Sequence, residues 1–106
     1  MVTRCDLSPG NQATQCAHVA LSFAVKHPDL IRAWHDASNN LVLLSVPDED
    51  SLMDLMDDAR RQGIKSVLFY EPDFDDALTA LAFPPGDTSR RFLSNLPLAL
   101  KETALV

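Results

Sequence analysis

Four polar side chains without a fixed charge recur at intervals of three and four residues near the start of the chain: Asn11, Gln15, His18 and Ser22. Each residue of a helix advances about 100°, so this spacing places all four on one face. A solvated helix face normally carries Lys, Glu and Arg. Amide, imidazole and hydroxyl groups can instead hold a polar substrate, and an imidazole can transfer a proton near neutral pH. The alternative role for His18 is that of a solvated structural residue.

The residues before this polar face predict how its helix begins. Ser8 suits the N-cap, because its hydroxyl can accept a hydrogen bond from an early helical N–H, and Pro9 suits the first helical position. The helix is expected to run from about Pro9 to Val25. Its apolar stripe is predicted to consist mainly of small residues: Ala13, Cys16, Ala17, Ala20, Leu21 and Ala24. The free N–H groups at such a helix start favour an anion or a developing negative charge.

A carboxylate further along the chain is predicted to join this face. The run Leu41–Val46 is typical of a strand buried on both faces, and Ile64–Tyr70 is a second strand after a helix that starts at Asp48. This order predicts a parallel pair with a right-handed crossover. Glu71 directly follows the second strand, and α/β sheets place ligand sites at the carboxyl ends of parallel strands. We therefore expect one cleft that contains Glu71 and the first three residues of the polar face.

Thr79 lies in the run Leu78–Phe83, which follows Glu71 too closely for a parallel crossover and is therefore expected to be an antiparallel strand. Its hydroxyl could serve the site, or it could be a strand residue with an internally satisfied hydroxyl. The other elements are expected as a strand within Met1–Leu7, helices over Asp29–Ala37 and Asp87–Asn95, an extended segment over Leu96–Leu100 and a frayed end over Lys101–Val106. Together they predict one α/β domain over residues 1–106, with three layers (α/β/α) and a mixed, roughly four-stranded sheet.

The sequence predicts no metal or redox site. The three histidines match no common metal-ligand spacing, and no CxxC pair is present. Cys5 and Cys16 are expected to be buried free thiols. Cys16 and His18 cannot form a nucleophile–base pair, because residues two apart on a helix point in nearly opposite directions. The acidic loop 71–76 lacks the glycine and the distant glutamate of an EF-hand, so we expect a solvated turn.

The composition fits an ordinary globular protein of net charge −6, and the acids are unevenly distributed. Residues 48–58 and 71–76 hold ten of the 15 acidic residues, so the rest of the chain carries nine basic and five acidic residues. Nucleic-acid binding is therefore not excluded by charge. No apolar run approaches the roughly 20 residues that cross a bilayer, so no membrane association is expected. The N-terminal residues lack the layout of a secretory signal, and we expect a cytoplasmic protein.

Two segments, in a fixed order, carry a resemblance to a known family. The first is DLSPGNQATQCAHVAL (Asp6–Leu21), with its Asp-Leu, its glycine and its Ala-x-Gln-Cys-x-His run. The second is VPDEDSLMDLMDDARRQGIKSVLFYEPD (Val46–Asp73), a Pro-Asp-Glu helix start, an amphipathic helix, a glycine and a strand that ends at an acid. Both resemble the type 2 peptidyl-tRNA hydrolases, and Leu78–Phe83 is similar to the last core strand of that family. The resemblance covers about residues 2–86.

This resemblance implies a mixed four-stranded sheet and hydrolysis of the ester that joins a peptide to tRNA, with no metal and no cofactor. By position, Gln15 and His18 match polar residues of the family's active site, and Thr79 matches a threonine in its last core strand. Glu71 falls near the family's functional aspartate, so a carboxylate is kept with one extra methylene. The family's catalytic lysine falls at Asn11, which can donate only a neutral hydrogen bond.

Two hypotheses follow from these residues. In the first, the protein hydrolyses peptidyl-tRNA. The catalytic set is then Asn11, Gln15, His18, Glu71 and Thr79, and the residues that bind the substrate are Ser8, Gly10 and Ser22. In the second, the same scaffold binds tRNA or a protein partner without cleaving it, because Asn11 stands where the family has a cation. The resemblance also makes a homodimer compatible with either hypothesis.

Overall fold

The computed structural model describes residues 1–101 and shows four strands and five helical segments among them. Their order is β1 (Val2–Arg4), α1 (Pro9–Lys26), α2 (Pro28–Ala37), β2 (Leu44–Val46), α3 (Glu49–Arg61), β3 (Val67–Glu71), the 3-10 helix η1 (Pro72–Phe74), β4 (Ala77–Ala82) and α4 (Asp87–Phe92). The last expected segment, the frayed end, lies outside the described residues apart from Lys101.

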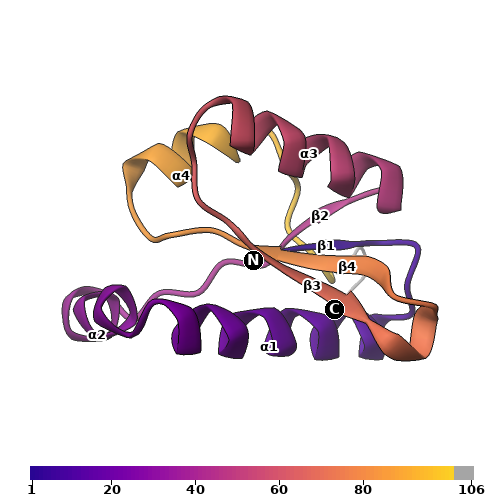
Figure 1. The fold of residues 1–106 in the computed structure, drawn as a ribbon, viewed down its shortest axis with the longest axis horizontal. Helices are drawn as coiled ribbons and strands as arrows, with labels where there is room; N and C mark the ends of the chain where they lie inside the picture. The colour runs from indigo at the N-terminus through magenta and orange to yellow at the C-terminus, as the bar shows by residue number, and fades with distance from the viewer. Residues whose placement is uncertain (102–106) are drawn as a thin grey trace.

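The strands form one mixed sheet in the order β2-β1-β4-β3. β1 is parallel to β2, and β4 is antiparallel to both β1 and β3. Figure 1 shows α1 and α2 on one side of this sheet and α3 and α4 on the other. The predicted three-layer α/β/α fold with a four-stranded mixed sheet is therefore confirmed, as is the antiparallel direction of β4.

The predicted pairing of the two strands around α3 is wrong. β2 and β3 run in the same direction, but β1 and β4 lie between them. The residues of β1 and β4 explain the order, because Val2, Thr3 and Leu78 to Ala82 are almost wholly buried and need neighbours on both sides. The parallel neighbour of β2 is instead β1, and α1 and α2 make the connection between these two strands.

Two apolar clusters hold the layers together. The cluster under α3 and α4 consists of Val2, Val46, Leu52, Met56, Leu78, Leu81 and Leu93. The cluster under α1 consists of Val19, Phe23, Val67, Ala80 and Ala82. β4 supplies residues to both clusters and so forms the centre of the core.

Helix α1 starts as predicted but presents a different face to the sheet. The Ser8 hydroxyl accepts a hydrogen bond from the N–H of Asn11 at 3.3 Å, and Pro9 is the first helical residue. The buried residues of α1 are Gln12, Gln15, Cys16, Val19 and Phe23. Of the predicted stripe, only Cys16 is buried, and Ala13, Ala17 and Leu21 are exposed. The larger side chains of Val19 and Phe23 fill the space above the sheet, so the helix is turned away from its alanines.

Three other expectations about exposure and length are corrected. Strand β2 begins only at Leu44, which pairs with Val2, the first residue of β1, and Leu41 and Val42 are 64% and 52% exposed. Cys5 is exposed rather than buried, since it lies just beyond the end of β1, whereas Cys16 is buried as expected. Neither cysteine is in a disulfide.

Two elements after α3, β3 and α4, are shorter than predicted. Strand β3 covers Val67–Glu71, and α4 ends at Phe92. The expected extended segment makes a single bridge, between Leu98 and Leu44, supported by a hydrogen bond from the N–H of Ser45 to the carbonyl of Pro97. Within residues 1–101, no helix has the length and apolar character needed to cross a membrane.

Candidate active site

A buried chain of hydrogen bonds joins three elements at one end of the sheet. The hydroxyl of Thr79 on β4 donates to Oε1 of Gln15 on α1 at 2.7 Å. Nε2 of Gln15 then donates to Oε1 of Glu71, the last residue of β3, at 3.1 Å. Thr79 and Gln15 are 0% and 1% exposed, so neither can exchange these partners for water. The donor–acceptor order turns the amide N–H of Gln15 toward the carboxylate, which suits the ionised form of Glu71.

An irregularity in the strand pairing aims Thr79 at α1. Phe69 pairs with Ala80 and Tyr70 with Leu78, so the register skips Thr79, whose hydroxyl also lies 3.3 Å from the carbonyl oxygen of Phe69. A bulge of this kind places two successive residues on the same face of a sheet. Ala80 packs in the cluster under α1, and the hydroxyl of Thr79 also reaches α1, whereas Leu78 packs under α3.

Alternation along β3 brings an aromatic ring and the carboxylate to the same face. Phe69 and Glu71 are two residues apart, so both side chains point toward α1. The imidazole of His18 is stacked on the ring of Phe69, with 4.6 Å between ring centroids and an interplanar angle of 3°. His18 is exposed and lies one turn after Gln15 on α1. The imidazole is therefore fixed in orientation and open to solvent beside the hydrogen-bonded chain.

The helix start lies next to this chain, but within residues 1–101 no side-chain hydrogen bond joins the two. Asn11 is exposed in the first turn of α1, four residues before Gln15 and so on the same side of the helix. Its backbone N–H is taken up by Ser8. Gly10 is exposed, and its carbonyl accepts a hydrogen bond from the Thr14 hydroxyl at 3.0 Å. The structure thus leaves the Asn11 side chain facing solvent at the border of the site.

Ser22 lies farther along α1, one turn beyond His18, and is half-buried. No hydrogen bond links it to the buried chain within residues 1–101. The predicted site residues therefore divide into a connected group, which contains Gln15, Glu71 and Thr79, and neighbours on α1. Ser22 lies seven residues after Gln15, about two turns along the helix.

Sequence reasoning missed two side chains that shape this region. Phe69 supplies the ring against which His18 stacks. Gln12 is 6% exposed, and its Nε2 donates to the carbonyl of Leu7 at 2.7 Å, which closes the connection between β1 and α1. Alternation back from Glu71 could have identified Phe69. The position of Gln12, three residues before Gln15 on a helix, could have placed it on the buried face.

The charge around the site is negative. Asp73, Asp75 and Asp76 follow Glu71 in the turn to β4, where Asp75 and Asp76 adopt left-handed backbone angles with φ of 54° and 58°. Arg4 is the only Lys or Arg among residues 1–18. It is paired with Asp6 at 2.9 Å, and this hydrogen-bonded partner lowers the pKa of the Asp6 carboxyl. No three His, Cys, Asp or Glu side chains among residues 1–101 are grouped so that they could hold a metal ion.

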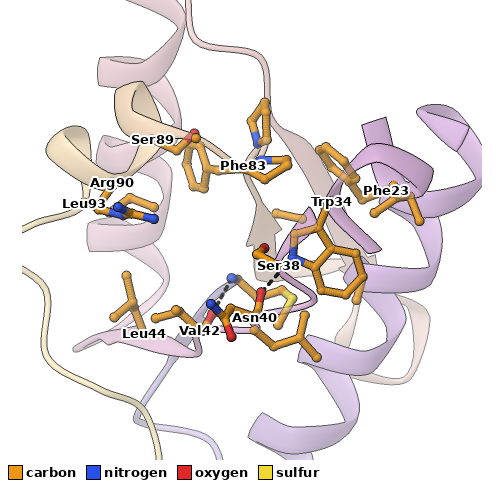
Figure 2. A pocket seen from close by; sticks show the side chains of 18 of the residues that line it. Phe23, Trp34, Ser38, Asn40, Val42, Leu44, Phe83, Ser89, Arg90 and Leu93 are labelled. Atoms are coloured by element: carbon orange, nitrogen blue, oxygen red, sulfur yellow. Dashed lines mark hydrogen bonds between the residues drawn. The ribbon is translucent and has the colours of Figure 1, made fainter. Parts of the chain in front are cut away.

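A cavity of about 420 Å³ lies away from these residues, where β1 begins and β4 ends. Figure 2 shows Phe23 and Trp34 on one side of it and Phe83 and Leu93 on the other. The Trp34 indole N–H donates to the carbonyl of Asn40 at 2.7 Å at its edge. None of the predicted site residues lines this cavity.

Comparison with known proteins identifies the family to which this fold belongs. The family model described as peptidyl-tRNA hydrolase PTH2 matches residues 1–96. The chain is 31% identical over 77 residues to the peptidyl-tRNA hydrolase 2, mitochondrial, of Bos taurus, a match that covers 67% of this chain and 43% of the relative. It is 34% identical over 78 residues to the protein of the same name from Mus musculus, covering 67% and 42%. The match thus spans less than half the length of these relatives. The chain belongs to the peptidyl-tRNA hydrolase PTH2 family.

Proposed function

We propose that the protein hydrolyses the ester bond between a peptide and the 3′ end of tRNA, and so returns tRNA to translation. Membership of the PTH2 family supports this class of reaction. The observation that carries the proposal is the buried chain from Thr79 through Gln15 to Glu71, because it holds a carboxylate at the solvent border beside an exposed imidazole. The aligned region is 43% and 42% of the two named relatives.

In the proposed reaction, a water molecule attacks the carbonyl carbon of the ester. The water gives a proton to Glu71, whose Oε1 is held by Gln15 while its second oxygen can face the water. The bond from the carbonyl carbon to the ribose oxygen then breaks. The proton passes to that oxygen and completes the free 3′-hydroxyl of tRNA. His18 is the second candidate base, since its ring is exposed next to Glu71 on the same face.

The remaining site residues have different tasks in this proposal. The Asn11 side-chain amide can donate a hydrogen bond to the developing oxyanion, and the positive end of the α1 dipole favours negative charge there. Ser8 and Gly10 lie in the same stretch and would border the tRNA end. Thr79 is wholly buried, so it serves the site by fixing the Gln15 amide and does not touch the substrate.

The direct experiment is release of peptide from N-acetylated aminoacyl-tRNA by the purified protein. The expected result is turnover above the rate in buffer, with free tRNA and free N-acetyl amino acid formed in equal amounts. Circular dichroism on the same preparation would show that the helices are formed. A folded protein that releases no product would contradict the proposal.

A second candidate function is binding without cleavage, and the exposed Asn11 favours it. An amide offers a neutral hydrogen bond where a lysine would offer a cation, and loss of such a donor typically costs on the order of 10²–10³ in rate. In this case the protein would bind the tRNA end and protect it. A salt-dependent gel shift with tRNA and no product would support this function. No shift at any salt concentration would leave a protein partner as the ligand of the scaffold.

The proposal also covers the location of the protein in the cell and its oligomeric state. We place residues 1–106 in one cytoplasmic domain that works without metal or cofactor, although both named relatives carry "mitochondrial" in their names. A homodimer belongs to the proposal as well. Leu21 and Val25 on the outer side of α1 are 68% and 81% exposed, and apolar side chains of this kind are candidates for a subunit contact. Sedimentation of wild-type protein and of Leu21→Lys would test it.

A further inference from the structure

The first residues of β4 pair with β3, but on the side toward β1 they are held by side chains instead of a strand ladder. β4 pairs with β1 only at Leu81 and Ala80, opposite Val2 and Thr3. The pairing does not continue to Thr79, the residue that precedes Ala80. Backbone groups of a buried strand need partners, and an unpaired N–H or carbonyl costs about 1–3 kcal/mol. The residues around Thr79 therefore require another source of hydrogen bonds.

Three side chains supply these hydrogen bonds. Oε2 of Glu49 accepts from the N–H of Leu78 at 2.7 Å. Nη1 of Arg4 donates to the carbonyl of Leu78 at 3.2 Å. The hydroxyl of Thr3 donates to the carbonyl of Thr79 at 2.9 Å. Leu78 is thus held on both of its backbone polar groups, immediately before the bulge that turns Thr79 toward Gln15.

The two charged partners of Leu78 are themselves fixed. Glu49 is the first residue of α3, and the helix start is set by Asp48, whose Oδ1 accepts from the N–H of Ser51 at 2.9 Å. The Nε and Nη2 atoms of Arg4 both donate to the Asp6 carboxylate at 2.9 Å, which leaves Nη1 for Leu78. The hydrogen-bonded Asp6 raises the pKa of Arg4 further above neutrality, so the guanidinium keeps its charge.

We propose that Glu49 and Arg4 are positioning residues for the candidate active site. By holding the N–H and the carbonyl of Leu78, they fix the strand irregularity that places the Thr79 hydroxyl on Gln15. Gln15 in turn holds the carboxylate of Glu71. The consequence for catalysis rests on the proposed hydrolase function, whereas the consequence for the backbone does not.

The backbone part is tested by amide hydrogen exchange of the full chain, followed by NMR. Glu49→Ala removes the acceptor that the Leu78 N–H has within residues 1–101, so exchange of this N–H is expected to accelerate at least tenfold. The N–H of Leu81, a residue paired with both neighbouring strands, should exchange as in wild type. Glu49→Gln keeps an acceptor oxygen and should restore most of the protection. The matched control is Asp50→Ala. It removes the neighbouring charge in the first turn of α3, but the hydrogen bond from Leu78 goes to Glu49 and is kept.

The catalytic part is tested with the same variants in the hydrolysis assay. Glu49→Ala should lower kcat about tenfold with less than a twofold change in KM, because the substrate is not contacted. Glu49→Gln should recover most of kcat, and Asp50→Ala should match wild type. Arg4→Lys, which keeps a charge but cannot hold Asp6 and Leu78 together, gives a second, milder variant if Glu49→Ala does not fold.

The outcomes separate this inference from the proposed function. Unchanged Leu78 exchange in Glu49→Ala, or equal acceleration in Asp50→Ala, would overturn the inference whatever the activity. Faster exchange with an unchanged kcat would overturn the positioning role. If wild type releases no product, the proposed function fails. The position of Thr79 is then read from the NMR signals of the Gln15 side-chain amide, which should shift in Glu49→Ala and return in Glu49→Gln.

Discussion

The hydroxyl of Thr79 and the side-chain oxygen of Gln15 are joined by a buried hydrogen bond of 2.7 Å across 64 positions of sequence. This bond orients an amide, and the amide orients the carboxylate of Glu71. The buried Thr79 therefore determines the orientation of Glu71, which lies at the solvent border of the site.

Removal of the Thr79 hydroxyl should destabilise the protein. In Thr79→Val the shape is kept, but Oε1 of the buried Gln15 loses its donor, which costs about 1–3 kcal/mol in free energy of unfolding. Denaturant unfolding measures this loss. Thr14→Val is the matched control, because Thr14 is exposed and precedes Gln15 on α1. This substitution should change the free energy of unfolding by no more than about 0.5 kcal/mol. Equal stability of Thr79→Val and wild type would show that the bond contributes nothing.

A lysine in place of Asn11 should accelerate hydrolysis. Asn11→Lys adds a cation at the exposed helix start, beside the place where negative charge develops, and we expect a rise in kcat of up to about 10²-fold. The control is Ala13→Lys, which adds the same charge at another exposed position of α1. If both variants change the rate equally, the effect comes from general attraction of tRNA, and the role given to position 11 is wrong.

The two cysteines should differ sharply in reactivity. Cys5 is exposed, whereas Cys16 is buried and desolvation raises the pKa of its thiol, which disfavours the reactive thiolate. A thiol reagent at mildly alkaline pH should therefore modify one group per native chain, and two after unfolding. Cys5→Ser should abolish the fast reaction. A fast reaction that persists in Cys5→Ser would place Cys16 at the surface and contradict the packing of α1.

At acidic pH, protonation of Asp6 should lower the free energy of unfolding. The Arg4 partner lowers the folded-state pKa of Asp6 below its usual 3.8, so this carboxylate stabilises the fold above that pH. The contribution is lost as the pH falls from 3.8 through the folded-state pKa. Between about pH 5 and pH 3, wild type should lose more free energy of unfolding than Asp6→Asn. Asp54→Asn, on the exposed side of α3, should follow wild type.

Local signals explain which parts of the fold could be predicted. Ser8 with Pro9 marked the start of α1, and the acid-rich start of α3 after Pro47 was equally clear, since caps and turns are properties of neighbouring residues. The carboxyl-end rule also indicated that Glu71 would approach the polar side of α1, and the bond to Gln15 brings these two residues together. The roles assigned to the site residues stay predictions until activity is measured.

Other features depend on long-range packing and could not be predicted. The many alanines of α1 gave a weak pattern, so only contact with the sheet decided that Val19 and Phe23 would face inward. The same holds for the bulge at Thr79, which has no local sequence signal because it arises from the register between β3 and β4. Leu41 and Val42 looked like part of a buried strand, but the ladder with β1 begins only at Leu44, and both side chains are exposed.

The central claim is that Glu71, held by Gln15, takes a proton from the attacking water. The measurement that tests it most directly is kcat for release of N-acetyl amino acid from tRNA by wild type, Glu71→Gln and Asp73→Asn. Glu71→Gln cannot accept the proton and should lower kcat by about 10²–10⁴-fold, the usual worth of a positioned base. Asp73→Asn removes a neighbouring exposed charge and should leave kcat within twofold of wild type. Turnover by Glu71→Gln at the wild-type rate would contradict the account.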